Sequence, residues 1–159
     1  MHLKLFQNLI EKWCHVDDHL QPVTPSELDS LEERFRTLLP ANYRECLETY
    51  GPVSVGLSLL SSIVEQNVQL EDLSQILSPE DIVQTTEGWR KAGLPLWFIA
   101  FASQGSGDLF CFKETTESAV RPMDALVYYF EHEEGGVDSM EITFTEWLKQ
   151  YVELKKTAA

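Results

Sequence analysis

A chain of 159 residues, 43% of them hydrophobic and 24% charged, has the size and composition of one domain that folds around its own core. Its 26 acidic and 12 basic residues give a formal net charge of −14 at pH 7, which repels nucleic acids and anionic membranes and attracts basic partners. Cys14, Cys46 and Cys111 are odd in number and far apart, which argues against a disulfide framework; with no apolar run near the ~20 residues of a membrane span, we expect a cytoplasmic protein.

Three helices are expected in the first part of the chain. Apolar residues recur at helical spacing over residues 3–13 and predict an amphipathic helix. The sequence Thr-Pro-Ser-Glu at residues 24–27 is a capping box, which starts a second helix. A third, short helix is predicted to begin within residues 39–43 and to end at Gly51.

The next segment is less regular. Residues 53–60 alternate weakly and predict a strand with a bend at Gly56. Residues 61–77 fit a short strand, a loop or a helix, and these alternatives stay open. Ser78 begins a Ser-Pro-Glu-Asp sequence that caps a helix, and Gly93 stops that helix.

Residues 98–112 contain two apolar, aromatic-rich runs joined by a Gly/Ser/Asp link, a pattern typical of a β-hairpin that is buried on both faces. Gly105 and Gly107 can take positive φ, and Asp108 can bond its own backbone at the turn. A phosphate-binding loop or a nucleophile elbow leads into a helix, whereas a strand follows here. We therefore interpret Gly105, Gly107 and Asp108 as a structural turn and expect no catalytic role for Ser106.

The C-terminal part predicts one more strand and one more helix. Residues 125–130 form a third aromatic run, Gly135 and Gly136 break the chain, and a second capping box at residues 143–146 starts the last helix. The tail, residues 155–159, is expected to fray. Strands thus concentrate in the middle of the chain and helices at its ends. This predicts a single α+β domain, with a central, mostly antiparallel sheet flanked by N-terminal and C-terminal helices.

Three short motifs go beyond this general pattern. Ala-x-x-Gly-x-Gly-Asp at residues 102–108 precedes an aromatic strand, Leu-Pro-x-x-Tyr stands at residues 39–43, and Tyr-Gly stands at residues 50–51. Together they resemble the SUKH superfamily, the Smi/Knr-like domains, over residues 24–154, which leaves residues 1–23 as an N-terminal helical extension. The resemblance implies a protein-binding domain without catalysis. Many bacterial members are immunity proteins that neutralise toxins, and other members are regulatory proteins.

Two histidines follow the first helix. If that helix continued through residue 19, His15 and His19 would share a face and Asp18 could join them around zinc. Two histidines four residues apart are a common accident, and surface residues at a helix end are the simpler interpretation. We therefore expect neither a metal site nor a cofactor.

Glu131 and His132 have the residue types of an acid–base pair. Adjacent residues in a strand point to opposite faces, so the two side chains are not expected to meet. Acidic neighbours favour protonated His132. We expect an acidic surface here instead of a catalytic site, and we expect Trp89 and Trp97 to be partly exposed contact positions.

Acidic residues without interspersed bases are the strongest pointer to a partner. No Lys or Arg occurs in residues 45–89 or 122–148, so their acids are predicted to form surfaces of one sign. The candidate partner-binding residues are Glu131, Glu133, Glu134, Asp138 and Glu141, with Glu71 and Asp72 as a second patch. The family resemblance suggests that the partner is a cognate toxin domain, basic if it is a nuclease, whose active site this chain covers. A regulatory scaffold of the Smi/Knr type and a small hydrolase are the alternatives.

Overall fold

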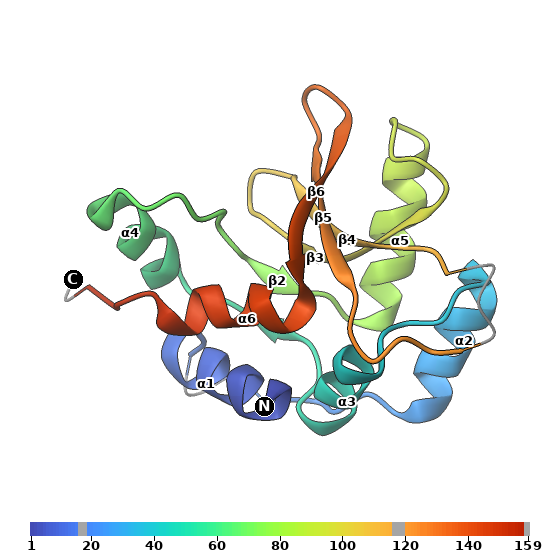
Figure 1. Ribbon diagram of the computed structural model, residues 1–159, viewed down its shortest axis with the longest axis horizontal. Coiled ribbons are helices and arrows are strands. Elements are labelled where there is room, and N and C mark those ends of the chain that lie inside the picture. The colour runs from blue at the N-terminus through green and yellow to red at the C-terminus, as the bar shows by residue number, and fades with distance from the viewer. Residues whose placement is uncertain (16–18, 116–119, 158–159) are drawn as a thin grey trace.

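The computed structural model describes residues 1–15, 19–115 and 120–157 (Figure 1). Its helices are α1 (His2–Trp13), α2 (Pro25–Phe35), α3 (Ala41–Thr49), α4 (Leu57–Gln66), α5 (Pro79–Arg90) and α6 (Phe144–Glu153). Its strands are β1 (Val53–Ser54), β2 (Gln75–Ile76), β3 (Phe98–Ser103), β4 (Leu109–Lys113), β5 (Leu126–Glu131) and β6 (Gly136–Thr143). Within these described residues, no helix is both long enough and apolar enough to cross a bilayer.

All the strands join one antiparallel sheet in which the spatial order follows the chain order, from β1 at one edge to β6 at the other. α4 connects β1 to β2 and α5 connects β2 to β3, whereas the described residues between the later strands contain no helix. α5 packs on β3, and α6 packs on α1 and on the last two strands (Figure 1). The predicted single α+β domain with a central antiparallel sheet is confirmed.

Both faces of the β3–β4 hairpin are buried, as its apolar runs predicted. On one face, Phe101 and Phe112 stack at 4.1 Å between ring centroids and pack with Tyr43 of α3 and Phe144 of α6. The alternate residues of the strands face α5, where Trp89 packs against a second, smaller cluster. That cluster consists of Leu94, Phe98, Ala100, Leu109, Cys111 and Phe130.

The capping boxes read from the sequence are present. Thr24 Oγ1 accepts from the Glu27 backbone N–H at 3.2 Å, and Thr143 Oγ1 accepts from the Glu146 backbone N–H at 3.3 Å. In each capping box, the glutamate carboxylate also accepts a hydrogen bond from the backbone N–H of the threonine. Ser78 caps α5 in the same way, at 3.2 Å. These local signals therefore fix where α2, α5 and α6 begin.

Both ends of the chain are bonded to the body of the domain. Trp13 of α1 is buried, and its indole N–H donates to the backbone oxygen of Tyr151 at 2.8 Å. Near the C-terminus, the Thr157 backbone N–H donates to Ser62 Oγ of α4 at 3.1 Å. The first helix thus shares the larger core, and the tail is bonded as far as residue 157.

The strand predicted over residues 53–60 is wrong beyond its first residues. β1 ends at Ser54, and α4 begins at Leu57 with Gly56 at the position that precedes the helix. The two apolar residues that α4 buries, Leu59 and Ile63, are four apart and share one face of a helix. Alternating apolar residues suggested a strand, but packing of this helical face overrides that local preference.

The sequence pattern does not predict β6. The pairing of β5 with β6 shifts between Leu126 and Tyr128, since Leu126 lies opposite Thr143 and Tyr128 lies opposite Ser139. One residue of β5 is therefore matched by three residues of β6, and Glu141 within this bulge has φ of +60°. The bulge breaks the alternation of buried and exposed residues, so β6 lacks the two-residue period by which a strand is predicted from sequence.

Candidate functional site

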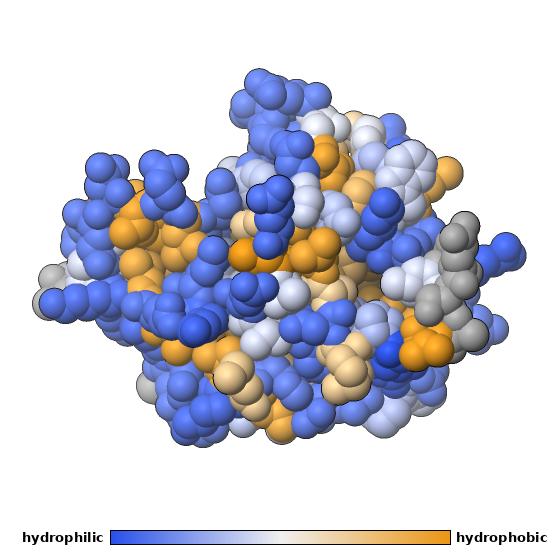
Figure 2. All heavy atoms as spheres, in the orientation of Figure 1, coloured by the Kyte–Doolittle hydropathy of each residue, from blue (hydrophilic) through white to orange (hydrophobic). Residues whose placement is uncertain are grey.

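The β5–β6 hairpin carries most of the acids selected from the sequence. Glu131 ends β5, and Glu133 and Glu134 lie in the turn. Asp138 and Glu141 follow on β6, and all except the half-buried Glu131 are exposed. The hairpin projects from the domain, and its visible surface is hydrophilic (Figures 1 and 2). We call Glu71, Asp72, Glu131, Glu133, Glu134 and Asp138 the acidic patch.

Glu71 and Asp138, far apart in sequence, both lie near Tyr129 of β5. Gln104 Nε2, in the β3–β4 turn, donates to Glu71 Oε2 at 3.2 Å and holds that carboxylate beside the hairpin. Burial, with the neighbouring carboxylates of Asp108 and Glu71, raises the pKa of the Tyr129 phenol far above its ordinary value. Asp138 lies directly opposite Tyr129 in the sheet, so the two side chains share one face. One residue from each of the two predicted patches therefore borders Tyr129.

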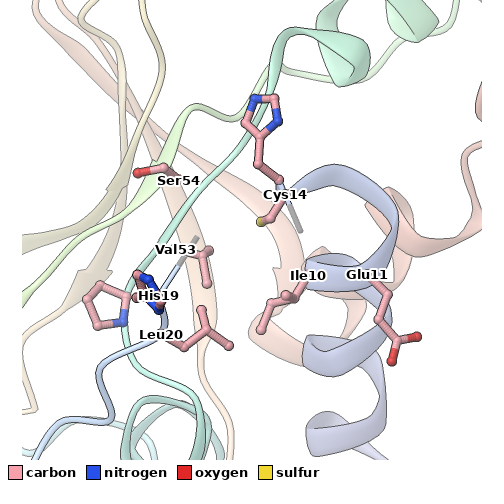
Figure 3. A pocket seen from close by; sticks show the side chains of 9 residues that line it. Ile10, Glu11, Cys14, His19, Leu20, Val53 and Ser54 are labelled. Carbon is pink, nitrogen blue, oxygen red and sulfur yellow. The ribbon is translucent and has the colours of Figure 1, made fainter. Parts of the chain in front are cut away.

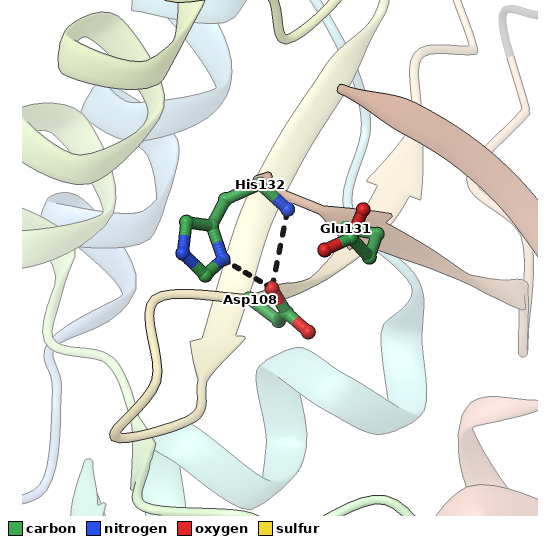
Figure 4. Close-up of side chains that lie close together, drawn as sticks. All are labelled: Asp108, Glu131 and His132. Carbon is green, nitrogen blue, oxygen red and sulfur yellow. Dashed lines mark hydrogen bonds and ion pairs between the residues drawn. The ribbon is translucent and has the colours of Figure 1, made fainter. Parts of the chain in front are cut away.

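Asp108 holds the base of the hairpin in place. Its carboxylate accepts hydrogen bonds from the Tyr129 hydroxyl, from His132 Nδ1 and, at 3.1 Å, from the backbone N–H of His132 (Figure 4). The imidazole also packs edge-on against Trp89 of α5, at 5.6 Å between ring centroids. We call Asp108, Tyr129 and His132 the clasp, because it ties the start of β4 to the end of β5.

Charge strengthens the clasp. The hydrogen bond to Asp108 raises the pKa of His132, and the charges of Asp108, Glu133 and Glu131 add to this effect against a smaller opposing effect of burial. Burial alone would raise the pKa of Asp108, but the bonds from Tyr129 and His132 outweigh it, and the pKa is lowered. The folded state therefore favours imidazolium beside carboxylate.

Glu131 shapes the turn of the hairpin. Its carboxylate accepts backbone N–H bonds from Glu133 at 3.2 Å and from Glu134 at 2.8 Å. One ligand atom from each of Glu131, His132 and Asp108 lies within 4.8 Å of the other two. The His132 imidazole bonds to Asp108, and the Glu131 carboxylate bonds to the turn. The strand ends at Glu131, so the alternation of faces no longer applies to His132.

Asp108, Glu131 and His132 are residue types that bind divalent cations, and Figure 4 shows the Asp108 carboxylate between the other two side chains. Both carboxylates already accept N–H or O–H donors of the hairpin and its base. The imidazole is likewise directed at Asp108. The geometry therefore fits a structural clasp better than an open ligand set.

The turn between β3 and β4 has the conformation expected of its glycine. Gly107 has φ of +110°, and a Cβ there would lie 3.4 Å from the His132 ring. The Asp108 backbone oxygen accepts from the Gln104 N–H at 3.0 Å, which closes the turn, while its carboxylate reaches across to β5. Gly105 is not among the positive-φ residues. The Ser106 hydroxyl donates to Gln104 Oε1 at 3.0 Å and is not directed at His132.

The two histidines proposed from sequence for an alternative zinc site line a pocket of about 380 Å³ beside the end of α1. Its lining includes Cys14, His15 and His19 (Figure 3). α1 ends at Trp13, so the condition of a shared helical face for the two histidines is not met. Asp18 lies outside the described residues. Both histidines are exposed, as expected for surface positions.

The two tryptophans singled out from the sequence differ in environment. Trp97 is 52% exposed at the start of β3, beside Leu96 at 66%. Trp89 is half-buried because it packs on Phe130 and His132. Trp97 is thus available for contact, whereas Trp89 supports the clasp.

The clasp itself was not foreseen. Asp108 was expected to bond within its own turn, and Tyr129 was interpreted only as part of an aromatic strand. The register of β4 against β5, with Leu109 opposite Phe130, brings these residues together. The sequence offers an acid just before one strand and a histidine just after the next strand. These two residues can be recognised as partners only when the pairing register of the two strands is known.

One comparison with known proteins identifies the chain's relatives. A SUKH family model described as SMI1-KNR4 cell-wall matches residues 3–153, a span that includes all but the first residue of α1 and all the described strands. No curated protein matches the chain. The matched span covers nearly the whole sequence, together with the antiparallel sheet and its glycine-rich β3–β4 turn. The chain therefore belongs to the SMI1-KNR4 family of the SUKH superfamily.

Proposed function

We propose that this chain is a non-catalytic immunity protein of the cytoplasm that binds a basic toxin domain and covers its active site. The observation that carries the proposal is that Glu71 and Asp138, from two base-free acidic segments, both lie near Tyr129 of the projecting β5–β6 hairpin (Figure 1). Membership of a family whose members bind proteins supports it. Toxins that act on nucleic acid are basic because they neutralise phosphates, and an acidic surface complements them.

Attraction and occlusion are separate parts of this mechanism. A net charge of −14 accelerates the encounter with a cationic partner, and the exposed acids of the hairpin orient it. The clasp holds the hairpin in one shape before binding, which limits the ordering cost of association. Once bound, this chain covers the active site of the toxin and so blocks access of its substrate.

Co-expression tests the proposal directly. The chain is produced with the toxin domain encoded beside its gene, and cell survival and copurification are scored. We expect survival and a stable complex with the unaltered chain. Replacing Glu133, Glu134 and Asp138 by lysine should lower protection, whereas the same charge change at Glu11, Glu33 and Glu153 should not. Equal protection by both triple variants, or toxicity despite expression of the unaltered chain, contradicts the proposal.

A regulatory or scaffold role is the second candidate, and α4 favours it. Leu57, Leu60 and Val64 project from this helix with exposed fractions of 82%, 41% and 68% (Figure 2). Apolar side chains gathered on one exposed helix often mark a protein contact. Loss of a copurifying host protein on replacement of Leu57 and Val64 by serine, with toxin protection unchanged, would favour this role.

A further inference from the structure

β6 leaves one edge of the sheet open. Residues 136–139 and Thr143 of this strand pair with β5 on one side, and no strand of the described residues pairs with the other side. Gly136, Asp138 and Ser139 are exposed, and the opposite edge of the sheet, β1, is only two residues long. An open strand edge presents unpaired N–H and C=O groups to any extended segment that approaches it.

The bulge limits how much of this edge can pair. Glu141 has φ of +60°, and its backbone N–H donates to Ser139 Oγ at 3.1 Å. Regular pairing with β5 covers residues 136–139, and Met140 is the last residue before the positive φ of Glu141. The extended edge therefore runs over residues 136–140, about 17 Å at ~3.4 Å per residue. Such a length accommodates a short strand of another chain.

Charge selects which chain can add there. Asp138 lies on the edge strand, Glu133 and Glu134 lie in the adjoining turn, and residues 122–148 contain no Lys or Arg. A second copy of this chain would place these acids against one another, which is unfavourable for strands directly opposite. A basic segment has the complementary sign.

The two faces of β6 specify the pattern of that segment. Asp138 shares its face with Tyr129, where Asp108 and Glu71 add negative charge. Val137 lies opposite Phe130 and packs on the smaller apolar cluster beside α5. A strand added beside β6 would alternate between these two environments.

We propose that the outer edge of β6 over residues 136–140 binds an extended segment of the partner by strand addition, with Lys or Arg at alternate positions and apolar residues between them. The proposal rests on the proposed function, since it names the part of the toxin domain that the hairpin binds. Backbone hydrogen bonds supply the affinity, and Asp138 with its neighbours selects the basic alternation.

Amide hydrogen exchange measured residue by residue by NMR tests strand addition. The probe is the peptide acetyl-(Lys-Val)₄-amide, and its control has the same sequence with every backbone amide N-methylated, which keeps the charge but removes the donors. At a concentration about ten times its dissociation constant, the first peptide should slow exchange of the outward-facing amides of residues 136–140 about tenfold. The N-methylated peptide should leave their exchange unchanged.

Two variants separate charge from strand geometry. Asp138→Lys should weaken binding of the Lys-Val peptide at least about tenfold, the scale of one close charge pair. Glu33→Lys, an equal charge change at an exposed position of α2, should alter the affinity for the Lys-Val peptide less than about twofold. Equal protection by the two peptides, or equal affinity of the two variants, overturns the proposal.

The same exchange experiment on the toxin complex distinguishes this proposal from the proposed function. If a toxin domain copurifies and is neutralised while residues 136–140 exchange as in the free chain, strand addition is wrong and the immunity role stands. If no toxin is neutralised but the Lys-Val peptide protects the edge, strand addition stands and the immunity role is wrong.

Discussion

Asp108 is the residue on which the shape of the acidic hairpin depends. Replacing it with asparagine keeps its size but removes the charge that holds His132 and Tyr129. We expect Asp108→Asn to lower the free energy of unfolding by about 1–3 kcal/mol, the range for losing charge-assisted hydrogen bonds. NMR titration should also show the pKa of His132 falling toward 6.5. An unchanged His132 titration would contradict the clasp.

The raised pKa of His132 makes stability depend on pH. Imidazolium is favoured in the folded state, so this contribution is complete below the ordinary pKa of 6.5 and is lost as the pH rises through the higher folded value. Urea unfolding at a series of pH values should therefore show a decline above pH 6.5 that His132→Gln reduces. Parallel stability curves for the two proteins would exclude this linkage.

Gly51 provides a test of backbone geometry with an internal control. Its φ is +88°, and a Cβ there would lie 2.1 Å from the backbone oxygen of Gln21. Gly51→Ala should therefore destabilise the fold by more than about 2 kcal/mol. Gly88→Ala, in α5 with no atom near the added Cβ, should stabilise it by about 0.5–1 kcal/mol. Thermal unfolding of both variants measures the contrast.

At the same scale, local chemistry was predictable and distant contacts were not. The glycine-rich link predicted the β3–β4 turn, because turn formation depends on residues that are adjacent in sequence. The partner of Asp108, His132, lies 24 residues away, and only the β4–β5 register brings the two together.

Helices with capping boxes and strands with unbroken apolar runs were predictable at the scale of the element, whereas α4 and β6 were not. α4 has no side-chain cap, and the bulge in β6 breaks its period. Alanine substitutions test α4, because a strand would place Leu57 and Leu59 on one face. Leu59→Ala should cost about 2–5 kcal/mol of stability, and Leu57→Ala should change it by less than about 0.5 kcal/mol. Similar losses at both positions would contradict the helix.

Across the whole molecule, net charge and family were readable from the sequence, but the joining of the acidic segments was not. Composition gives the sign of the field, and the fold determines where the acids gather. Glu71 joins the hairpin acids because the segment before β2 lies beside the β3–β4 turn. We therefore expect the acidic patch, and not charge in general, to guide recognition.

The most direct test is the association rate of the purified toxin domain as a function of ionic strength. The triple variant Glu133→Lys, Glu134→Lys and Asp138→Lys leaves Glu131, which shapes the turn, intact. Its association should be at least about tenfold slower than that of the unaltered chain at low salt, with the difference shrinking as salt rises. The association rate of the matched triple variant at Glu11, Glu33 and Glu153 should fall much less. Equal slowing by both variants would mean that overall charge, and not this patch, guides the encounter.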